Sequence, residues 1–313
     1  MTTMTKHLNR FSTFKCWVVA AAVIFGVSVI SWETAVVSVK AAETQAVVTQ
    51  QRAVKAKLQR YVNLVTKDGT TSVAFYNLGA KSTTQAGRAK SARFYAPGKL
   101  AVYSKNAHRA YTSASTYKLF VAASIYARIN AGTLSRSVTR SSGFQQMILH
   151  SRNEFAEHYL GTYGYGRVNN FVAKQNWYKH PFGTGRAART TAATLVSVLR
   201  KLDQQKYPFN QSSSRQQLLS LMSRQVYRSG IPKGAATATK GSRVADKVGW
   251  LWSYNNDAGI VTLPNGQRYA LVIMTHGHGQ HGFSGFPRIA RITKNIQTIV
   301  YGKATTKQIN ALY

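Results

Sequence analysis

The sequence predicts an α+β fold, in which an antiparallel sheet is built from both ends of the chain, with flanking helices and an all-helical insert at about residues 116–205. Two observations lead to this prediction. Strand patterns of β-branched and aromatic residues occur before residue 105 and again after residue 242, but not between. The residues between them show apolar side chains at helical spacing. With 313 residues, 44% of them apolar, the chain can fill one substantial core.

Before the insert, the sequence predicts a helix, two strands and a loop. Apolar residues recur at helical spacing over residues 46–65, with Lys and Arg between them, which is typical of an amphipathic surface helix. A turn at Asp68-Gly69 precedes a strand at residues 71–78, and residues 100–104 form a second strand. Residues 80–97 are rich in Ser, Thr, Gly and Lys, and are therefore predicted to be a loop.

The insert opens with a buried helix. Residues 119–129 are apolar on almost every face, and Arg128 is their single charge. The predicted helix starts at Ser115 and is closed by Gly132, which suits a left-handed position. Further helices are predicted at residues 141–149, 151–160, 168–174, 190–202 and 215–226. No strand pattern is found between Gly132 and residue 202. A Gly- and Ala-rich turn is expected after them.

The C-terminal part returns to strands. They are predicted at residues 243–252, 256–263 and 267–275. Pro264-Asn265-Gly266 joins the last two and is a hairpin signal. A helix at residues 286–301 closes the chain. Because no repeat or internal linker is found, we expect residues 42–313 to form one domain. We also expect the protein to be a monomer.

The N-terminal residues have the pattern of an export signal. Three basic residues precede an uncharged stretch from Cys16 to Trp32, and Val39 and Ala41 are small residues at the positions that a signal peptidase reads. We predict a signal peptide over residues 1–41, with an uncleaved membrane anchor as the alternative. The protein is then secreted or associated with the surface of a bacterium. Cys16 is the single cysteine, so the exported chain has neither a disulfide nor a thiol nucleophile.

The charge is strongly positive, with 42 Lys and Arg against 8 Asp and Glu. Such a field favours polyanionic partners. The basic residues are scattered, without the basic block, zinc-finger spacing or ribonucleoprotein motif of a nucleic-acid-binding protein. We therefore expect anionic cell-wall polymers or a membrane surface as partners, rather than nucleic acid.

Ser115 and Lys118 form the first candidate catalytic motif. Residues three apart on a helix are neighbours, so the hydroxyl and the amine share one face. A lysine kept neutral by burial or by a second cation is a base strong enough to activate a serine. By itself, the S-x-x-K pattern is also compatible with an N-terminal serine and a lysine that reaches solvent.

Two further motifs follow in a fixed order. Ser151-Arg152-Asn153 is predicted to open a helix, and Lys247-Val248-Gly249 lies in a predicted strand. Each has a simpler interpretation, because Ser151 with Glu154 matches a capping box and Lys247 could occupy an exposed strand position. S-x-x-K, S-x-N and K-x-G in this order, on a helix, a helix start and a strand, form a much rarer coincidence than any one motif.

With these motifs the sequence resembles the class A β-lactamase and penicillin-binding serine hydrolase superfamily, over about residues 50–303. The resemblance implies the β-lactamase/transpeptidase-like fold and a substrate that is a β-lactam or a peptidoglycan-derived D-alanyl peptide. It implies that Ser115 attacks a carbonyl to form an acyl-enzyme, with Lys118 as the neighbouring base. Ser151 then relays the proton to the leaving nitrogen.

The resemblance also implies roles for the strand motif. Lys247 draws the substrate carboxylate and keeps the Lys118 amine neutral by repulsion. Asn153 hydrogen-bonds the substrate amide, and Gly249 lets the substrate lie against the strand. The backbone N–H groups of Ser115 and Trp250 form the oxyanion hole. No metal or other cofactor is implied.

Two acidic residues of the family pattern are absent from this sequence. Arg152 replaces the usual aspartate, and residues 158–202 contain no Asp or Glu, so the loop glutamate that activates the deacylating water in class A enzymes has no counterpart. Glu157 is the nearest acid. We therefore expect weak β-lactam turnover. The alternative is a non-catalytic cell-surface protein of the same fold that binds anionic wall polymers.

Other departures concern the size and polarity of the strand. Val248 lacks the hydroxyl that usually helps to bind the substrate carboxylate, and Trp250 and Trp252 are bulky for a substrate-binding edge. A histidine-rich stretch follows at residues 276–282. Its glycines make it too flexible for a closed metal site, and few carboxylates are available to complete a ligand set. We predict a flexible loop at the rim of the active site.

Overall fold

The computed structural model describes residues 44–313. The predicted signal peptide, residues 1–41, lies outside the described residues, so its cleavage stays a prediction. Residues 44–65 are helical, as predicted, and residues 50–311 belong to one compact unit. Within the described chain, no helix has the length and hydropathy that crossing a membrane requires.

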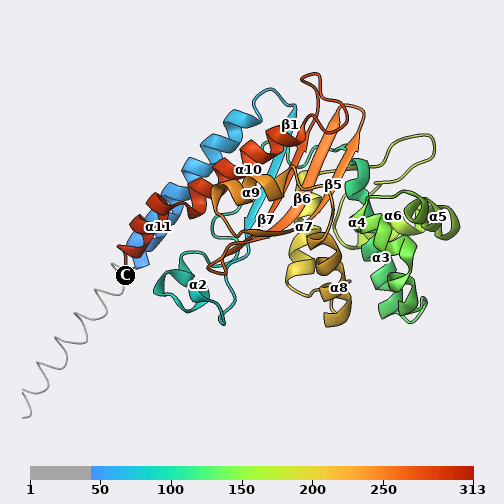
Figure 1. Ribbon diagram of the computed structural model, residues 1–313, viewed down its shortest axis with the longest axis horizontal. Coiled ribbons are helices and arrows are strands. Elements are labelled where there is room, and N and C mark those ends of the chain that lie inside the picture. Colours follow the sequence, from blue (N-terminus) through green and yellow to red (C-terminus); the bar gives the residue numbers. More distant parts are fainter. Residues whose placement is uncertain (1–43) are drawn as a thin grey trace, which may run out of the picture. The chain divides into compact units, whose positions relative to one another are not determined.

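The centre of the fold is a five-stranded antiparallel sheet in the order β2-β1-β7-β6-β5 (Figure 1). Its strands are β1 (Thr71–Asn77), β2 (Val102–Tyr103), β5 (Arg243–Leu251), β6 (Tyr254–Thr262) and β7 (Arg268–Thr275). β1 pairs with β7 along its whole length, from Thr71 opposite Thr275 to Asn77 opposite Tyr269. The prediction that both ends of the chain build one sheet is therefore confirmed.

One face of this sheet is covered by helices from the two ends of the chain. α10 (Phe286–Tyr301) has the predicted bounds and lies beside the helix of residues 50–65, where Asn295 Nδ2 donates to the Tyr61 hydroxyl at 2.9 Å (Figure 1). α10 buries Ile289, Ile292 and Ile296 at helical spacing. α11 (Lys303–Asn310), which the sequence did not predict, follows it.

The opposite side is helical and surrounds α3 (Lys118–Asn130). Leu119, Phe120 and Val121 have no exposed surface, because neighbouring helices cover α3 on all sides. Gly132 follows with a φ of 70°, so the buried helix and its left-handed closing glycine are as predicted. The surrounding helices are α4 (Ser142–Leu149), α5 (Glu154–Tyr163), α6 (Tyr165–Lys174), α7 (Ala192–Asp203) and α8 (Ser212–Ser223).

Three local predictions were wrong. The insert contains a strand, β4 (Arg189–Thr190), which pairs with β3 (Tyr111–Thr112), because two-residue strands are too short to show alternation in the sequence. The Gly- and Ala-rich turn is instead α9 (Ile231–Ala238), and a Cβ at Gly234 would lie 2.2 Å from the Ala290 carbonyl oxygen of α10. Its small residues therefore serve close helix packing. The predicted loop at residues 80–97 contains short helical turns, including α2 (Gln85–Arg88).

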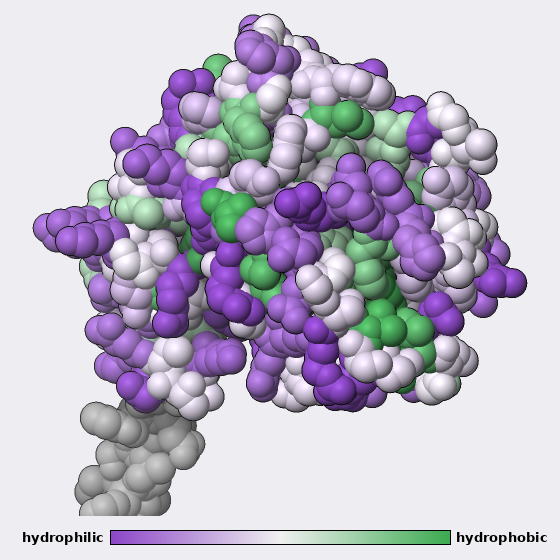
Figure 2. All heavy atoms as spheres, turned by 45° about the vertical axis from the view of Figure 1, so that its right-hand side comes forward, coloured by the Kyte–Doolittle hydropathy of each residue, from purple (hydrophilic) through white to green (hydrophobic). Residues whose placement is uncertain are grey.

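The surface of the helical side is mostly polar. Figure 2 shows hydrophilic side chains over most of one face of the molecule, with apolar side chains in small, separate patches. Single exposed apolar side chains are normal for a soluble domain and do not define a docking surface.

Candidate active site

Ser115 lies in a tight turn at the start of the buried helix. The turn is a 3₁₀ helix, Ala114–Tyr117, and the α-helix begins only at Lys118, three residues later than predicted. Ala114 has a φ of 43°, a left-handed conformation that costs a non-glycine residue roughly 1–3 kcal/mol. Ser113 fixes the turn, because its N–H donates to the Ala188 carbonyl at 2.8 Å.

Lys118 has its ammonium against the Ser115 hydroxyl. The Lys118 side chain is fully buried, and its Nζ donates to Ser115 Oγ at 2.8 Å, to the Ser151 carbonyl at 2.6 Å and to Asn153 Oδ1 at 2.6 Å. Burial lowers the pKa of Lys118 to about 8, against the opposing charges of Glu157 and Glu154. A group with that pKa is neutral in roughly a tenth of the molecules at pH 7 and so can take up the serine proton.

Acylation of Ser115 should therefore accelerate as the pH rises through about 8 and level off above it, because only neutral Lys118 accepts a proton. Glu157→Gln removes a charge that favours the protonated amine, so it should move the rise to lower pH. The measurement is the rate of adduct formation with a penicillin from about pH 6 to about pH 10. A rate that stays constant across this range would exclude Lys118 as the base.

Ser151 links the two lysines. It is a buried residue with a φ of 58°, and this left-handed conformation lets its carbonyl accept from Lys118 while its Oγ accepts from Lys247 Nζ at 2.7 Å. The capping-box interpretation is wrong, because α5 begins at Glu154 and Asn153 occupies the N-cap position. The Ser151 hydroxyl is therefore engaged by a lysine, and not by a helix terminus.

Lys247 is fully buried on β5, so the alternative of an exposed strand position is also wrong. Its Nζ donates to Ser151 Oγ and, at 2.7 Å, to the Val248 carbonyl. Burial, reinforced by the positive charge of Lys118, lowers the pKa of Lys247 well below its usual value. The charge of Lys118 therefore makes the charged form of Lys247 less favourable.

No sequence motif marks the residues that hold β5 in place. Gln225 accepts from the Val248 N–H at 3.1 Å and donates to Asp246 at 2.8 Å. Arg228 donates to the other oxygen of Asp246 at 2.5 Å. These side chains come from the segment after α8, and they were missed because only the tertiary fold brings that segment to the sheet edge.

The direction of the Val248 N–H identifies a second donor. In an antiparallel pair, every second N–H points to the same side of a strand. Since the Val248 N–H bonds to Gln225, away from β6, the Trp250 N–H also points away from β6. The Trp250 ring packs at 4.8 Å from that of Tyr227 and at 4.5 Å from that of Phe283. Alternation places this ring on the face opposite to Gly249, so its bulk does not fill the catalytic side.

Gly249 sits directly against the catalytic turn. A Cβ atom there would lie 2.7 Å from the Ser115 nitrogen and 2.8 Å from the Thr116 nitrogen. Gly249 therefore permits close approach of β5 to the Ser115 N–H at the start of the helix, whereas the neighbouring Thr116 N–H donates to the Ser113 carbonyl at 3.2 Å. The Trp250 N–H follows Gly249 directly along β5, so we expect it to lie on the same side of the nucleophile as the Ser115 N–H.

Gly249→Ala should lower the acylation rate by about 10²-fold or more, the usual effect of displacing an oxyanion donor. The added methyl group meets backbone atoms, so the turn or the strand must shift. The rate of penicillin labelling is measured beside Gly161→Ala, where a Cβ meets nothing within 4 Å and no effect is expected. Unchanged acylation in a folded Gly249→Ala protein would show that this approach is not needed.

An aromatic side chain, and no acid, comes from the segment in which the family resemblance places the loop glutamate. The segment between α6 and α7 carries Phe182, whose buried ring lies 5.6 Å from that of Tyr117 and 6.1 Å from that of Tyr165. Glu157 lies exposed on α5. Burial lowers the pKa of Lys118 and raises that of Tyr117, and the Glu157 charge opposes the first shift and adds to the second. Of the acids in the described chain, Glu157 and Glu154 are the two whose charges act on the catalytic lysine.

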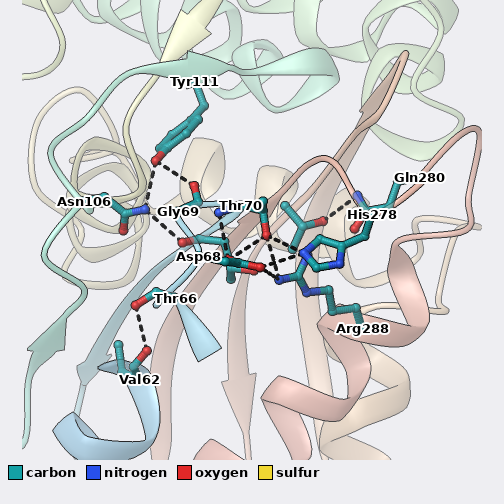
Figure 3. Close-up of polar contacts among 12 residues, drawn as sticks. Val62, Thr66, Asp68, Gly69, Thr70, Asn106, Tyr111, His278, Gln280 and Arg288 are labelled. Carbon is teal, nitrogen blue, oxygen red and sulfur yellow. Dashed lines mark hydrogen bonds and ion pairs between the residues drawn. The ribbon is translucent and has the colours of Figure 1, made fainter. Parts of the chain in front are cut away.

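The three histidines after β7 make separate contacts. The His276 ring lies 5.3 Å from that of Tyr111 and 5.1 Å from that of Tyr254. His278 pairs with Asp68 at 2.7 Å, as Figure 3 shows, and His281 Nδ1 lies 3.1 Å from the Gly279 carbonyl oxygen. Among residues 44–313, no group of three His, Cys, Asp or Glu side chains could hold a metal ion.

Comparisons with known proteins agree with this architecture. A family model described as the β-lactamase enzyme family matches residues 137–302, a segment that contains Ser151 and Lys247 and begins after Ser115. Among solved structures, PBP-A is 19% identical, with a TM-score of 0.59, over 82% of this chain and 96% of that chain. A comparison with curated proteins finds no match.

Two β-lactamases are similar to the same extent. One from Chitinophaga pinensis is 14% identical, with a TM-score of 0.59, over 79% of this chain and 99% of that chain. A class A β-lactamase from Mycobacterium abscessus is 18% identical, with a TM-score of 0.58, over 78% of this chain and 99% of that chain. At these identities the likeness establishes the fold, and the activity has to be argued from the site.

Proposed function

The chain belongs to the β-lactamase enzyme family, and on that premise we propose that it is an exported serine hydrolase that acylates Ser115 with a β-lactam or a D-alanyl peptide of the peptidoglycan type. The observation that carries the proposal is the 2.8 Å contact between Ser115 Oγ and the buried Lys118 amine. A nucleophile in contact with a base of lowered pKa is the arrangement that covalent catalysis requires.

The site supports a balanced acylation step. Neutral Lys118 takes the proton of Ser115 Oγ as this oxygen bonds to the substrate carbonyl carbon. The N–H groups of Ser115 and Trp250 stabilise the resulting oxyanion. When the carbon–nitrogen bond breaks, the leaving nitrogen takes a proton from the Ser151 hydroxyl, which the Lys247 ammonium restores through their 2.7 Å hydrogen bond.

The intact mass of the protein after incubation with a penicillin tests the proposal. We expect an increase equal to one penicillin molecule, located by peptide mapping on Ser115. A protein that acquires no adduct at high penicillin concentration would contradict it.

The formal net charge of +34 favours a second candidate, a surface protein that holds anionic wall polymers without turnover. Such binding should weaken steeply as the salt concentration rises, because salt ions compete with the anionic polymer for the basic side chains. Salt-dependent polymer binding without penicillin labelling would favour this candidate. This candidate function leaves the two buried lysines, Lys118 and Lys247, without a role, and we therefore rank it second.

A further inference from the structure

A cavity of about 690 Å³ opens beside the end of β5, apart from the motif residues. It is lined by Arg109, Arg186 and Arg189 together with the aromatic rings of Tyr111, Trp252 and Tyr254. Trp252 is 67% exposed in the turn that follows β5. No step of the proposed reaction uses these residues.

The cavity is close to the nucleophile along two elements. Thr112, at the end of β3, lines it and precedes Ser115 by three residues. Trp252 follows the oxyanion donor Trp250 by two residues, and two residues of extended chain span about 7 Å. Asn256 links the two elements through β6, because it pairs with Gly249 of β5 and its Nδ2 donates to the Thr112 carbonyl at 2.9 Å.

The three arginines of the cavity have no acidic partner. Among the described residues, no carboxylate forms an ion pair with any of them. Arg189 donates to the Ala110 carbonyl at 2.8 Å, and Arg186 donates to the His180 carbonyl at 2.7 Å. The guanidinium of Arg109 lies 5.7 Å from the ring centre of Tyr111. These contacts orient the side chains but leave their charges unneutralised.

Asp68 lines the cavity, but other groups already engage its charge. Figure 3 shows its carboxylate accepting from the backbone and hydroxyl of Thr70, with His278 and Arg288 beside it. Partial burial raises the pKa of Asp68, but these hydrogen bonds and the charge of Arg288 lower it to about 2. Asp68 therefore stays ionised and turned to its own partners, and the cavity keeps an excess of positive charge.

The aromatic wall of the cavity is held in place. The Tyr111 hydroxyl accepts from Asn106 Nδ2 at 2.8 Å and donates to the Gly69 carbonyl at 3.3 Å, as Figure 3 shows. The His276 ring packs against both Tyr111 and Tyr254. Guanidinium groups match carboxylates in a two-pronged geometry, and fixed aromatic rings offer apolar faces to a peptide backbone or side chain.

The direction of the substrate along β5 says which part of it reaches the cavity. In the proposed reaction, the substrate carboxylate lies at the Lys247 end and the scissile carbonyl at Ser115, beside Gly249. The part of the substrate that precedes this carbonyl then extends past Trp250 towards Trp252. At about 3.3 Å per extended residue, the second or third residue before the carbonyl then lies level with Trp252, where the cavity opens.

We propose that this cavity is a subsite for a carboxylate on the acyl side of the substrate, so that the enzyme prefers acidic D-alanyl peptides over neutral ones. The proposal rests on the proposed function, since it takes the direction of the substrate from it. It adds a substrate class that the three motifs do not specify.

The test compares two peptides that differ by one carboxylate, acetyl-Glu-Ala-D-Ala-D-Ala and acetyl-Gln-Ala-D-Ala-D-Ala. Their affinities are measured by calorimetry on a Ser115→Ala protein, which binds without turnover. We expect the Glu peptide to bind about tenfold more tightly, the effect of a hydrogen bond to a charged group. In a protein that also carries Arg109→Gln, Arg186→Gln and Arg189→Gln, the two affinities should become equal.

A matched control removes three exposed arginines elsewhere, with Arg52→Gln, Arg224→Gln and Arg243→Gln, and should keep the preference, which excludes a general effect of net charge. Three outcomes overturn the proposal. The two peptides bind equally well to the protein with all its arginines, or neither peptide binds measurably, or the preference survives the loss of the three cavity arginines. Penicillin labelling of Ser115 reports separately on the proposed function, so the two can fail independently.

Discussion

Ser115→Ala should abolish covalent labelling by penicillin, and Lys118→Ala should slow acylation by at least about 10²-fold, the usual effect of losing a general base. The reason is the shared geometry of the two residues. Lys118 Nζ lies 2.8 Å from Ser115 Oγ, and burial lowers the pKa of this amine to about 8. Removing the hydroxyl removes the atom that becomes acylated, whereas removing the amine leaves a serine that is a poor nucleophile at neutral pH.

The Lys118 variant needs controls, because truncating this buried side chain also leaves the Ser151 carbonyl and Asn153 Oδ1 without their donor. Lys118→Met keeps the volume of the side chain but not the base, and should show the same loss of rate. Lys201→Ala removes a second lysine whose pKa burial lowers, in α7, and should acylate normally. The rate is followed by intact mass, with thermal unfolding as the check of folding. Normal acylation in a folded Lys118→Ala protein would remove Lys118 from the mechanism.

The sequence predicted those parts of the fold that depend on local pattern. The α10 helix and the hairpin at Pro264-Asn265-Gly266 have strong periodicity or turn chemistry, and both form where predicted. The secondary-structure predictions were wrong where tertiary contacts, and not the local pattern, determine the structure. The composition of α9 suggested a turn, yet its small residues allow close contact with α10. A two-residue strand such as β4 carries no pattern that a sequence could show.

The candidate site divides in the same way. The three motifs named the side chains that the structure brings together at Ser115, Lys118, Ser151 and Lys247. Their conformations were not predictable, because no local pattern marks the left-handed backbone of Ser151, through which this residue meets both lysines. Gln225 was missed for another reason. It reaches β5 from a segment with no motif, and only the fold shows that it caps the Val248 N–H.

The acyl-enzyme formed from penicillin should persist after free penicillin is removed. Acylation needs Ser115, a base and the oxyanion donors, all of which have candidates. Deacylation also needs a positioned water molecule and a base for it. The described segment between α6 and α7 supplies no carboxylate and places the Phe182 ring against Tyr117. Losing a general base costs roughly 10² to 10⁴ in rate, so the protein should behave more like a penicillin-binding protein than an efficient β-lactamase.

Residual hydrolysis, where it occurs, should depend on Glu157. This exposed carboxylate on α5 is one of two described acids whose charge acts on Lys118, which makes it our candidate for activating water near the ester. Decay of the adduct is timed by mass after free penicillin is removed, in the wild type, in Glu157→Gln and in Glu154→Gln as the matched exposed control. Only Glu157→Gln should lengthen the lifetime.

Hydrolysis that survives this change and rises with pH through about 8 would show that Lys118 activates the water instead, because that is the pH at which its amine becomes neutral. Loss of the adduct within seconds, with rapid turnover, would mean that an efficient deacylating base exists and that the protein is a β-lactamase.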